Sequence, residues 1–440
     1  MLGACYPSPG VDQEGGQLPA PFPAPTSLAV TSPSHAPKPA IIGGRSSVLQ
    51  GDPDFDPDSL APDVRRWYDE LWASLELPEQ RRYIARLAAS DNLYEYSRLV
   101  HTYVVSLLTG LRATGDLRLL DEADQISELM RAQLADSWRG TGNRESNRDG
   151  YLNWVWRNDT SEEHLGKDLH QTDEMGTHSL VAELAWAYAS NKDHPSPAGV
   201  DYGERADFWL DYLQNHFEAK WRERNQVRWP RFPFINRPHM HETVSFIKYH
   251  YYMYRLTARE QYLSEAKRLS DLVYEEFRQV QTDAGPAFVW PRSIVSEGGS
   301  ERYLMPTTYS SLVLLDSLDL HLEGFYGWAD GSVPERFANT VSQFIIDNGS
   351  SDFARDVGGG QTRAGLAASS ARDWERLTAP QFAIKPFALL SAWDDSGTIG
   401  SVAREVYADL PTEHLYLHIP VGMMIEAMKE TVVAQDEPAE

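Results

Sequence analysis

The segment from Glu242 to Leu256 is the feature that most constrains how this chain can fold. Its apolar and aromatic side chains point in every direction around a helix axis: Val244, Phe246, Ile247, Tyr249, Tyr251, Tyr252, Met253 and Tyr254. A helix that is apolar on all sides belongs in an interior, because any exposed face would leave apolar surface in water. The rest of the chain must therefore enclose this helix.

Helices that are apolar nearly all round alternate along the chain with amphipathic helices. The first kind is expected at about 94–111, 177–190, 241–256, 306–322, 380–393 and 413–429. The second kind is expected at about 62–75, 117–135, 203–221, 259–280, 334–347 and 397–409, with an extra helix near 79–90. This alternation predicts an all-α fold, an (α/α)6 toroid or an incomplete version of it, in which inner helices are surrounded by outer ones. An irregular helical bundle is the alternative.

The two ends of the chain differ in composition from the helical part. Residues 1–58 are rich in Pro, Ala, Ser and Gly, which predicts a disordered or extended tether. We expect the toroid domain at 59–432 and a disordered acidic tail at 433–440. The sequence LGAC, which ends at Cys5, is similar to a bacterial lipobox but lacks the basic and apolar segments that precede one. A secreted or periplasmic location is expected, with lipid anchoring through Cys5 as one option.

The charge of the chain excludes some partners. The formal net charge is −24, whereas a protein that coats nucleic acid needs a basic footprint to neutralise phosphates, so no nucleic-acid partner is expected. No run approaches the roughly 20 apolar residues that cross a bilayer, so no membrane-spanning segment is expected either. A single cysteine excludes an internal disulfide.

Four long loops lead into enclosed helices, at 136–172, 222–240, 281–305 and 348–379, so they should share one face. They contain 15 Arg, one Lys and 15 acidic residues, whereas the remainder has 24 basic and 49 acidic residues. Arginine binds carboxylate or sulfate groups in a planar, bidentate manner. Six of the 13 Trp are also here, including Trp154 and Trp290, although some of the six are expected to pack in the core. Aromatic rings and guanidinium groups together suit an anionic polysaccharide.

Histidines stand at the start of two enclosed helices. His239 and His241 open the one near 241–256, and His178 lies in the first turn of another. The alternative for His178 is a structural histidine. Asp173 and Glu174 nearby could suggest a metal site, but a helix cap and a favourable charge at the helix N-terminus explain them better. We therefore predict no metal and no other cofactor.

The start of the next enclosed helix carries Arg302 and, seven positions later, Tyr309. Together with His241, this arrangement resembles the toroid polysaccharide lyases that act on uronic-acid polymers, of the alginate- and glucuronan-degrading type. In those enzymes an Asn-His pair opens one inner helix, and an Arg stands seven positions before a Tyr near the start of another. The resemblance implies that His241, Tyr309 and Arg302 are catalytic. Met240 stands where those enzymes have Asn, so the group that neutralises the substrate carboxylate is left open.

The chemistry of β-elimination explains why these residue types fit. The C5 proton of a 4-linked uronide becomes removable when the adjacent carboxylate is neutralised, because charge then spreads into an enolate. A base takes this proton and an acid protonates O4 as it leaves. A guanidinium beside Tyr309 would lower its pKa from the ordinary value of about 10, and His241 could make the complementary proton transfer. The alternative for Tyr309 is simple packing in the core.

Further residues are expected to bind the substrate, and Asn236, Arg237, His239 or His178 could neutralise its carboxylate. The expected set is His178, Arg231, Asn236, Arg237, His239, Trp154, Trp290 and Tyr303. Three other functions stay open. A glycoside hydrolase would need two facing carboxylates, and the candidates Glu242, Asp173, Glu174 and Glu297 form no obvious pair. A sugar epimerase could use His178 and His241. A non-catalytic glycan-binding protein would need only the Trp and Arg residues.

Overall fold

The computed structural model describes residues 41–42, 45–46, 48–138, 148–155, 157, 171–223, 239–294, 304–347, 352–354, 356–359, 384, 386–409 and 417–436. Most of these residues are helical and the strands are few and short, which confirms the all-α prediction. Among them, no helix is both long and apolar enough to cross a membrane. The predicted tail at 433–440 falls partly on the last helix, which continues to Asp436.

The helices agree in position with those predicted from the sequence. The enclosed helices are α4 (His101–Thr114), α6 (Gln171–Asn191), α9 (Met240–Thr257), α11 (Thr307–Leu322) and α16 (His418–Asp436). The amphipathic helices are α1 (Pro62–Glu76), α2 (Pro78–Ala88), α5 (Leu117–Arg131), α7 (Tyr202–Tyr212), α10 (Glu260–Glu276), α12 (Ser332–Thr340) and α15 (Thr398–Ala408).

Short elements complete these helices. The three residues of α3 (Leu93–Glu95) and the π-helical turn η2 (Tyr96–Val100) lead into α4. The π-helical turns η4 (Leu213–Glu218) and η6 (Val341–Ile345) extend α7 and α12, and α8 (Ala219–Glu223) follows η4. The 3-10 helices are η1 (Pro57–Ser59), η5 (Tyr326–Ala329) and η9 (Ala388–Trp393). An enclosed α-helix was predicted at 380–393, and in the last six residues of that segment the structure has the tighter 3-10 helix η9.

Four two-stranded antiparallel sheets were not predicted. They pair β1 (Ile41–Ile42) with β2 (Arg45–Ser46), β3 (Ala135–Trp138) with β4 (Arg148–Asn153), β5 (Arg278–Thr282) with β6 (Gly285–Val289), and β7 (Ile346–Asp347) with β8 (Asp352–Phe353). The helix expected to reach residue 280 ends at Glu276, because the chain turns into the β5–β6 hairpin. Gly285 closes that hairpin at a φ of 116°, a conformation that strongly favours glycine.

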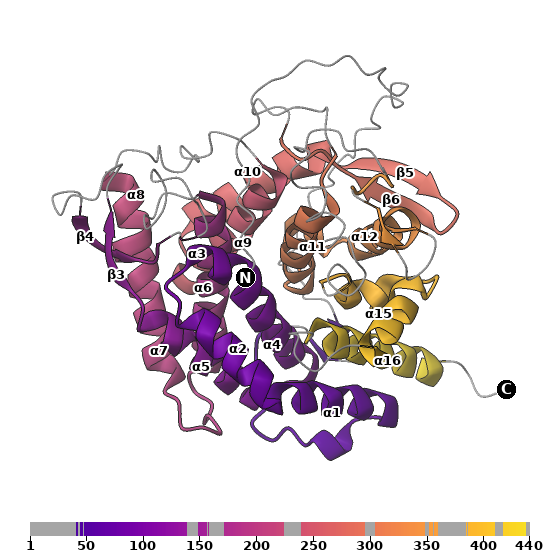
Figure 1. Cartoon of the computed structure of the whole chain (residues 1–440), viewed down its shortest axis with the longest axis horizontal. Helices are drawn as coiled ribbons and strands as arrows, with labels where there is room; N and C mark the ends of the chain where they lie inside the picture. The colour runs from indigo at the N-terminus through magenta and orange to yellow at the C-terminus, as the bar shows by residue number, and fades with distance from the viewer. Residues whose placement is uncertain are drawn as a thin grey trace, which may run out of the picture.

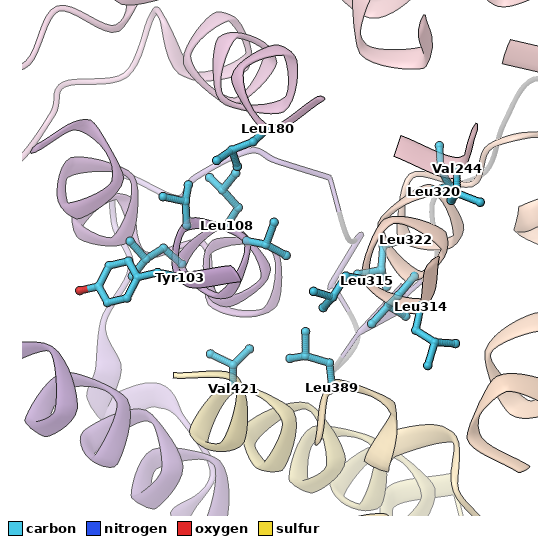
Figure 2. Close-up of a cluster of buried hydrophobic side chains, with 14 of the residues drawn as sticks. Tyr103, Leu108, Leu180, Val244, Leu314, Leu315, Leu320, Leu322, Leu389 and Val421 are labelled. Atoms are coloured by element: carbon cyan, nitrogen blue, oxygen red, sulfur yellow. The ribbon is translucent and has the colours of Figure 1, made fainter. Parts of the chain in front are cut away.

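The enclosed helices pack in sequence order. In Figure 1, α4, α6, α9 and α11 surround the middle of the view, while α1, α7, α10 and α12 lie farther out. Contacts join α4 to α6, α6 to α9 and α9 to α11, and α16 contacts both α4 and α1. Figure 2 shows side chains from α4, α6, α9, α11, η9 and α16 in one buried apolar cluster. Gly422 lets α16 approach η9 closely, since a Cβ there would lie 2.1 Å from the carbonyl oxygen of Ala388.

Four of these helices run in the same direction. At one end, Arg98, just before α4, contacts Asp173 in the first turn of α6, and His241 in α9 stacks on Tyr309 in α11. At the other end, Arg112 in the last turn of α4 pairs with Glu323, which follows α11. The N-terminal ends of α4, α6, α9 and α11 therefore meet at one end of the core.

The structure corrects the boundary of the predicted N-terminal tether. Leu49 is fully buried, and the side chain of Asn191 joins α6 to this segment. Its amide nitrogen donates to the carbonyl oxygen of Leu49 at 2.8 Å, and its oxygen accepts from the backbone N–H of Gly51 at 2.7 Å. The segment 48–58 is therefore joined to the helices through Leu49 and Gly51, and a deletion that ends at residue 58 would remove part of the fold.

We expect Leu49→Ala to lower the free energy of unfolding by about 2–4 kcal/mol, because it leaves a cavity under a fully buried side chain. Urea unfolding followed by tryptophan fluorescence measures this change. The exposed Asp54 lies in the same segment, and Asp54→Ala is the matched control that should change stability by less than about 0.5 kcal/mol. If the Leu49→Ala and native proteins are equally stable, the predicted end of the tether at residue 58 would stand.

Candidate functional site

Five side chains meet where the N-terminal ends of the enclosed helices converge: Arg98, His239, His241, Arg292 and Tyr309, here called the Tyr309 cluster. They come from η2, from α9 and the residue before it, from the segment after β6 and from α11. These residues come from four separate parts of the chain. The cluster therefore exists only because the helices pack as they do.

Backbone contacts fix the segment after β6 against the start of α9. The backbone N–H of Met240 donates to the carbonyl oxygen of Arg292 at 2.9 Å, and His239 forms a β-bridge with Ser293. The Nδ1 atom of His239 also lies 3.1 Å from the hydroxyl of Ser293. These bonds use backbone N–H groups that the first turn of a helix would otherwise leave without partners. They place Arg292 beside the two histidines.

The rings in the cluster are stacked in a row. The His239 and His241 ring centroids are 5.6 Å apart, and those of His241 and Tyr309 are 5.1 Å apart. The guanidinium carbons of Arg98 and Arg292 lie 5.2 Å and 5.9 Å from the centroid of the Tyr309 ring. Two cations thus lie against one phenol ring, within the range of cation–π attraction.

Asp173 holds one of these cations in place. Its carboxylate oxygen Oδ1 accepts from the Ser97 hydroxyl at 2.5 Å and from Arg98 Nε at 3.3 Å. Asp173 is buried in the first turn of α6, where a negative charge also interacts favourably with the helix dipole. The side chain of Arg98 remains 20% exposed, so its guanidinium can contact a ligand as well as Asp173.

Two nitrogen atoms of the Tyr309 cluster are buried without a hydrogen-bond partner within the part of the chain that the structure describes. They are Nδ1 of His241 and Nε of Arg292. Buried polar atoms in folded proteins are nearly always paired, so each exception calls for an explanation. A ligand bound at the Tyr309 cluster would supply the missing partners.

The electrostatics of the cluster keep His241 neutral. Burial, followed by the positive charges of Arg98, His239 and Arg292, holds the pKa of His241 well below its ordinary value of about 6.5. A neutral imidazole can accept a proton, and it does not compete with the arginines for an anion. The cluster thus combines fixed positive charge with two groups capable of proton transfer.

The structure places His178 away from this chemistry and corrects its assignment as a substrate-binding residue. It is fully buried, its Nδ1 lies 2.7 Å from the carbonyl oxygen of Glu174, and its Nε2 lies 2.9 Å from the hydroxyl of Tyr212. Its ring stacks on Phe217 with centroids 3.7 Å apart. Both ring nitrogens have partners, so His178 is a structural histidine, which was the alternative considered for it.

The two tryptophans expected to form a sugar platform are fully buried. Trp154 donates its indole N–H to the carbonyl oxygen of Met130 at 2.8 Å. The Trp290 ring packs edge-on against Phe277 and Phe337. We therefore assign both rings to the core, where they anchor the segments after β4 and β6, and not to a binding surface.

Several predicted site residues lie outside the described residues: Arg231, Asn236, Arg237, Arg302 and Tyr303, as does Cys5. The structure does bring His239, His241 and Tyr309 together. It adds Arg98 and Arg292, which sequence reasoning missed. Arg98 had one available signal, since it is a charged residue next to an otherwise apolar helix and so needs a partner or a function. Within the described residues, no group of three or more His, Cys, Asp or Glu side chains is placed to hold a metal ion.

Comparisons of the chain with protein-family models, with curated proteins and with solved structures give no match.

Proposed function

We propose that this chain is a polysaccharide lyase that cleaves a 4-linked polymer containing uronic acid, of the alginate or glucuronan type, by β-elimination at the Tyr309 cluster. The observation that carries the proposal is the Tyr309 ring stacked on a neutral His241 with the guanidinium groups of Arg98 and Arg292 beside it. This set supplies what the reaction needs, namely positive charge for a carboxylate and two groups that can exchange protons.

Each part of the reaction has a candidate group. Arg98 and Arg292 would bind the uronate carboxylate, and the unpaired Nε of Arg292 is a donor for one of its oxygens. This neutralisation lets negative charge spread from C5 into the carboxylate as the C5–H bond breaks. Tyr309 and His241 would take the C5 proton and protonate O4, while the C4–O4 bond breaks and a C4–C5 double bond forms. Arg302 stays a predicted member of the site.

The alternatives have less support in the described residues. Of the carboxylates considered for a glycoside hydrolase, Asp173 is held by Ser97 and Arg98, and Glu174 is held by Lys220 and Trp221, which does not suit an acid or base. An epimerase that uses His178 and His241 would need a histidine with an available nitrogen, and both nitrogens of His178 have partners. A non-catalytic glycan-binding protein would not need a stacked His–Tyr pair beside two arginines.

We also propose a more specific fold, an incomplete (α/α)6 toroid, and a location outside the cytoplasm. The order in which the enclosed helices pack, their shared direction and the return of α16 to α1 and α4 support an incomplete (α/α)6 toroid. Sites are usually built where long loops gather over a rigid scaffold, and the Tyr309 cluster lies where the loops before α9 and α11 end. An enzyme with a polymeric substrate would act outside the cytoplasm, in the medium or the periplasm.

The test is a panel of acidic polysaccharides, including alginate and polyglucuronate, incubated with the full chain. A lyase produces an unsaturated uronate, whose conjugated double bond absorbs short-wavelength ultraviolet light, so this absorbance should rise with time on at least one polymer. A hydrolase would instead release reducing ends with no rise in absorbance. Binding of a polymer with neither product would show a non-catalytic protein. Either of these last two results would overturn the proposal.

A further inference from the structure

Charged side chains occupy the interior between four of the enclosed helices, well below the Tyr309 cluster. Each is at most 5% exposed, and together they form what is here called the central ionic cluster: Arg112 of α4, Glu183 of α6, Lys248 of α9, Asp316 and Asp319 of α11, and Glu323, which follows α11. Charged residues are almost never fully buried unless they are paired. The contacts among these six residues show how well each is paired.

Two buried cations share four carboxylates. Lys248 Nζ lies 2.6 Å from Glu183, 3.2 Å from Asp316 and 3.5 Å from Asp319. Arg112 lies 2.6 Å from Asp319, contacts Glu323 directly and lies 3.6 Å from Glu183. The cations alone do not balance the four carboxylates.

Two further basic groups lie at the margin of the cluster. Arg255, with a side chain that is 25% exposed, pairs with Glu323 at 2.6 Å, and His101 Nε2 lies 3.5 Å from Asp316. Counting Arg255, three cations face four carboxylates, and neither ring nitrogen of His101 makes a hydrogen bond within the described residues. These cations therefore leave one surplus negative charge in the central ionic cluster when every carboxylate is ionised. An uncompensated charge in the interior costs several kcal/mol, and binding one proton removes it.

The contacts single out Glu183 as the group that takes this proton. Asp316 accepts from the Ser245 hydroxyl at 2.6 Å as well as pairing with Lys248. Asp319 and Glu323 accept from the hydroxyls of Tyr252 and Tyr251 at 2.7 Å and 3.0 Å, in addition to Arg112. Each of these three carboxylates therefore accepts a hydroxyl hydrogen bond in addition to pairing with a cation.

Glu183 has a less favourable environment. The groups that face it are Lys248 and Tyr252 of α9, Arg112 of α4 and the like-charged Asp319 of α11. Burial, and then the negative charge of Asp319, raises the pKa of Glu183 to about 7 despite the attraction of Lys248 and Arg112. The charge balance and the contacts thus point to the same residue.

We propose that the central ionic cluster is a pH-sensitive device, in which Glu183 holds a proton in the folded protein at acidic pH and loses it as the pH rises through neutrality, at a cost to the packing of α6 against α9 and α11. The proposal is independent of the lyase activity. The same helices carry Asp173, His241 and Tyr309 at their N-terminal ends. The proposal therefore also predicts that the packing at that end of the core is weaker at higher pH.

The sign of the effect follows from the two states of Glu183. In the unfolded chain its pKa is ordinary, about 4.3, whereas the folded value is about 7. A raised carboxyl pKa adds stability below the unfolded value, and this contribution is lost as the pH rises through the folded value. His250 is also titratable, and burial lowers its pKa to about 3, so its contribution to stability rises with pH instead of falling. Because this contribution is the same in the native protein and in a Glu183 variant, the difference between the two proteins reports Glu183 alone.

The experiment compares Glu183→Gln with the native chain by urea unfolding from pH 5 to pH 9. Glutamine keeps the shape of protonated glutamate but cannot ionise. Relative to this variant, the native folding equilibrium should weaken on the order of a hundredfold between pH 5 and pH 8. Glu335→Gln, at an exposed position on α12, is the matched control and should follow the native profile. A native-to-variant ratio that stays constant with pH would overturn the proposal.

A second measurement needs only the native protein and applies even if Glu183→Gln does not fold. Infrared difference spectra between pH 6 and pH 8 should show the carbonyl stretch of a buried, protonated carboxyl group disappearing as the pH rises through about 7. Absence of any such band at pH 6 would show that all four carboxylates of the central ionic cluster are ionised, and the proposal would be wrong.

Discussion

Tyr309→Phe should lower turnover on the polymer by at least about a hundredfold while changing the free energy of unfolding little. The phenyl ring keeps the stacking on His241 and the contacts with Arg98 and Arg292, because those involve the ring and not the hydroxyl. Only the proton-transfer group is removed. The measurement is the initial rate of short-wavelength ultraviolet absorbance on a substrate of the native enzyme, with urea unfolding of the same preparations.

The matched control is Tyr254→Phe, which removes a hydroxyl from a partly buried tyrosine in the last turn of α9, at the other end of the core. It should keep native turnover. Near-native turnover in Tyr309→Phe would exclude Tyr309 as an acid or base, and an unfolded variant would favour a packing role. If His241→Ala keeps its turnover while Tyr309→Phe loses it, Tyr309 carries both proton transfers and the role given to His241 is wrong.

Lys248→Met should destabilise the fold by about 3–5 kcal/mol, which is a large part of the stability of a typical domain. Methionine fills a similar volume, so the loss is electrostatic. Glu183, Asp316 and Asp319 would lose the cation that pairs with all three, and buried charge would be left without compensation. Urea unfolding at pH 7 measures the loss.

Lys192→Met provides the control, since Lys192 is exposed just beyond the end of α6 and its replacement should change stability by less than about 0.5 kcal/mol. The double variant Lys248→Met, Glu183→Gln should recover part of the loss, because it removes a cation and its closest carboxylate together. A Lys248→Met protein as stable as the native one would show that the central ionic cluster has no net effect on folding.

The helices could be predicted because apolar periodicity is a property of the local sequence and does not depend on which partner a helix packs against. Every residue from Met240 to Met253 in α9 is buried, as the apolar residues around that helix required. The β5–β6 hairpin could not be predicted, because a two-stranded sheet of five-residue strands leaves little pattern in a loop. The packed segment around Leu49 was also missed, since one leucine in a Pro-rich stretch shows no periodicity.

The candidate site was predicted only in part, for a physical reason. His241 and Tyr309 each open an enclosed helix, so parallel helices bring them together. Arg98 and Arg292 reach the site through a π-helical turn and a β-bridge, which no local pattern announces. His178 and His241 were both expected at the start of an enclosed helix, but α6 begins at Gln171, and His178 is a structural histidine because Tyr212 and Glu174 pair with it. Position on a helix does not reveal the partners.

The contacts of the last helices with the first ones have a consequence for the order in which the chain folds. The Tyr407 hydroxyl of α15 lies 3.2 Å from that of Ser74 in α1, across 333 residues of sequence, and α16 packs against α1 and α4. On the ribosome, the hairpin-like neighbours from α4 to α11 can form as they emerge, because their contacts are local. The faces of α1 and α4 that pack against α16 stay uncovered until α16 itself has been made. A nascent chain that stalls before α16 emerges therefore exposes apolar surface that favours aggregation.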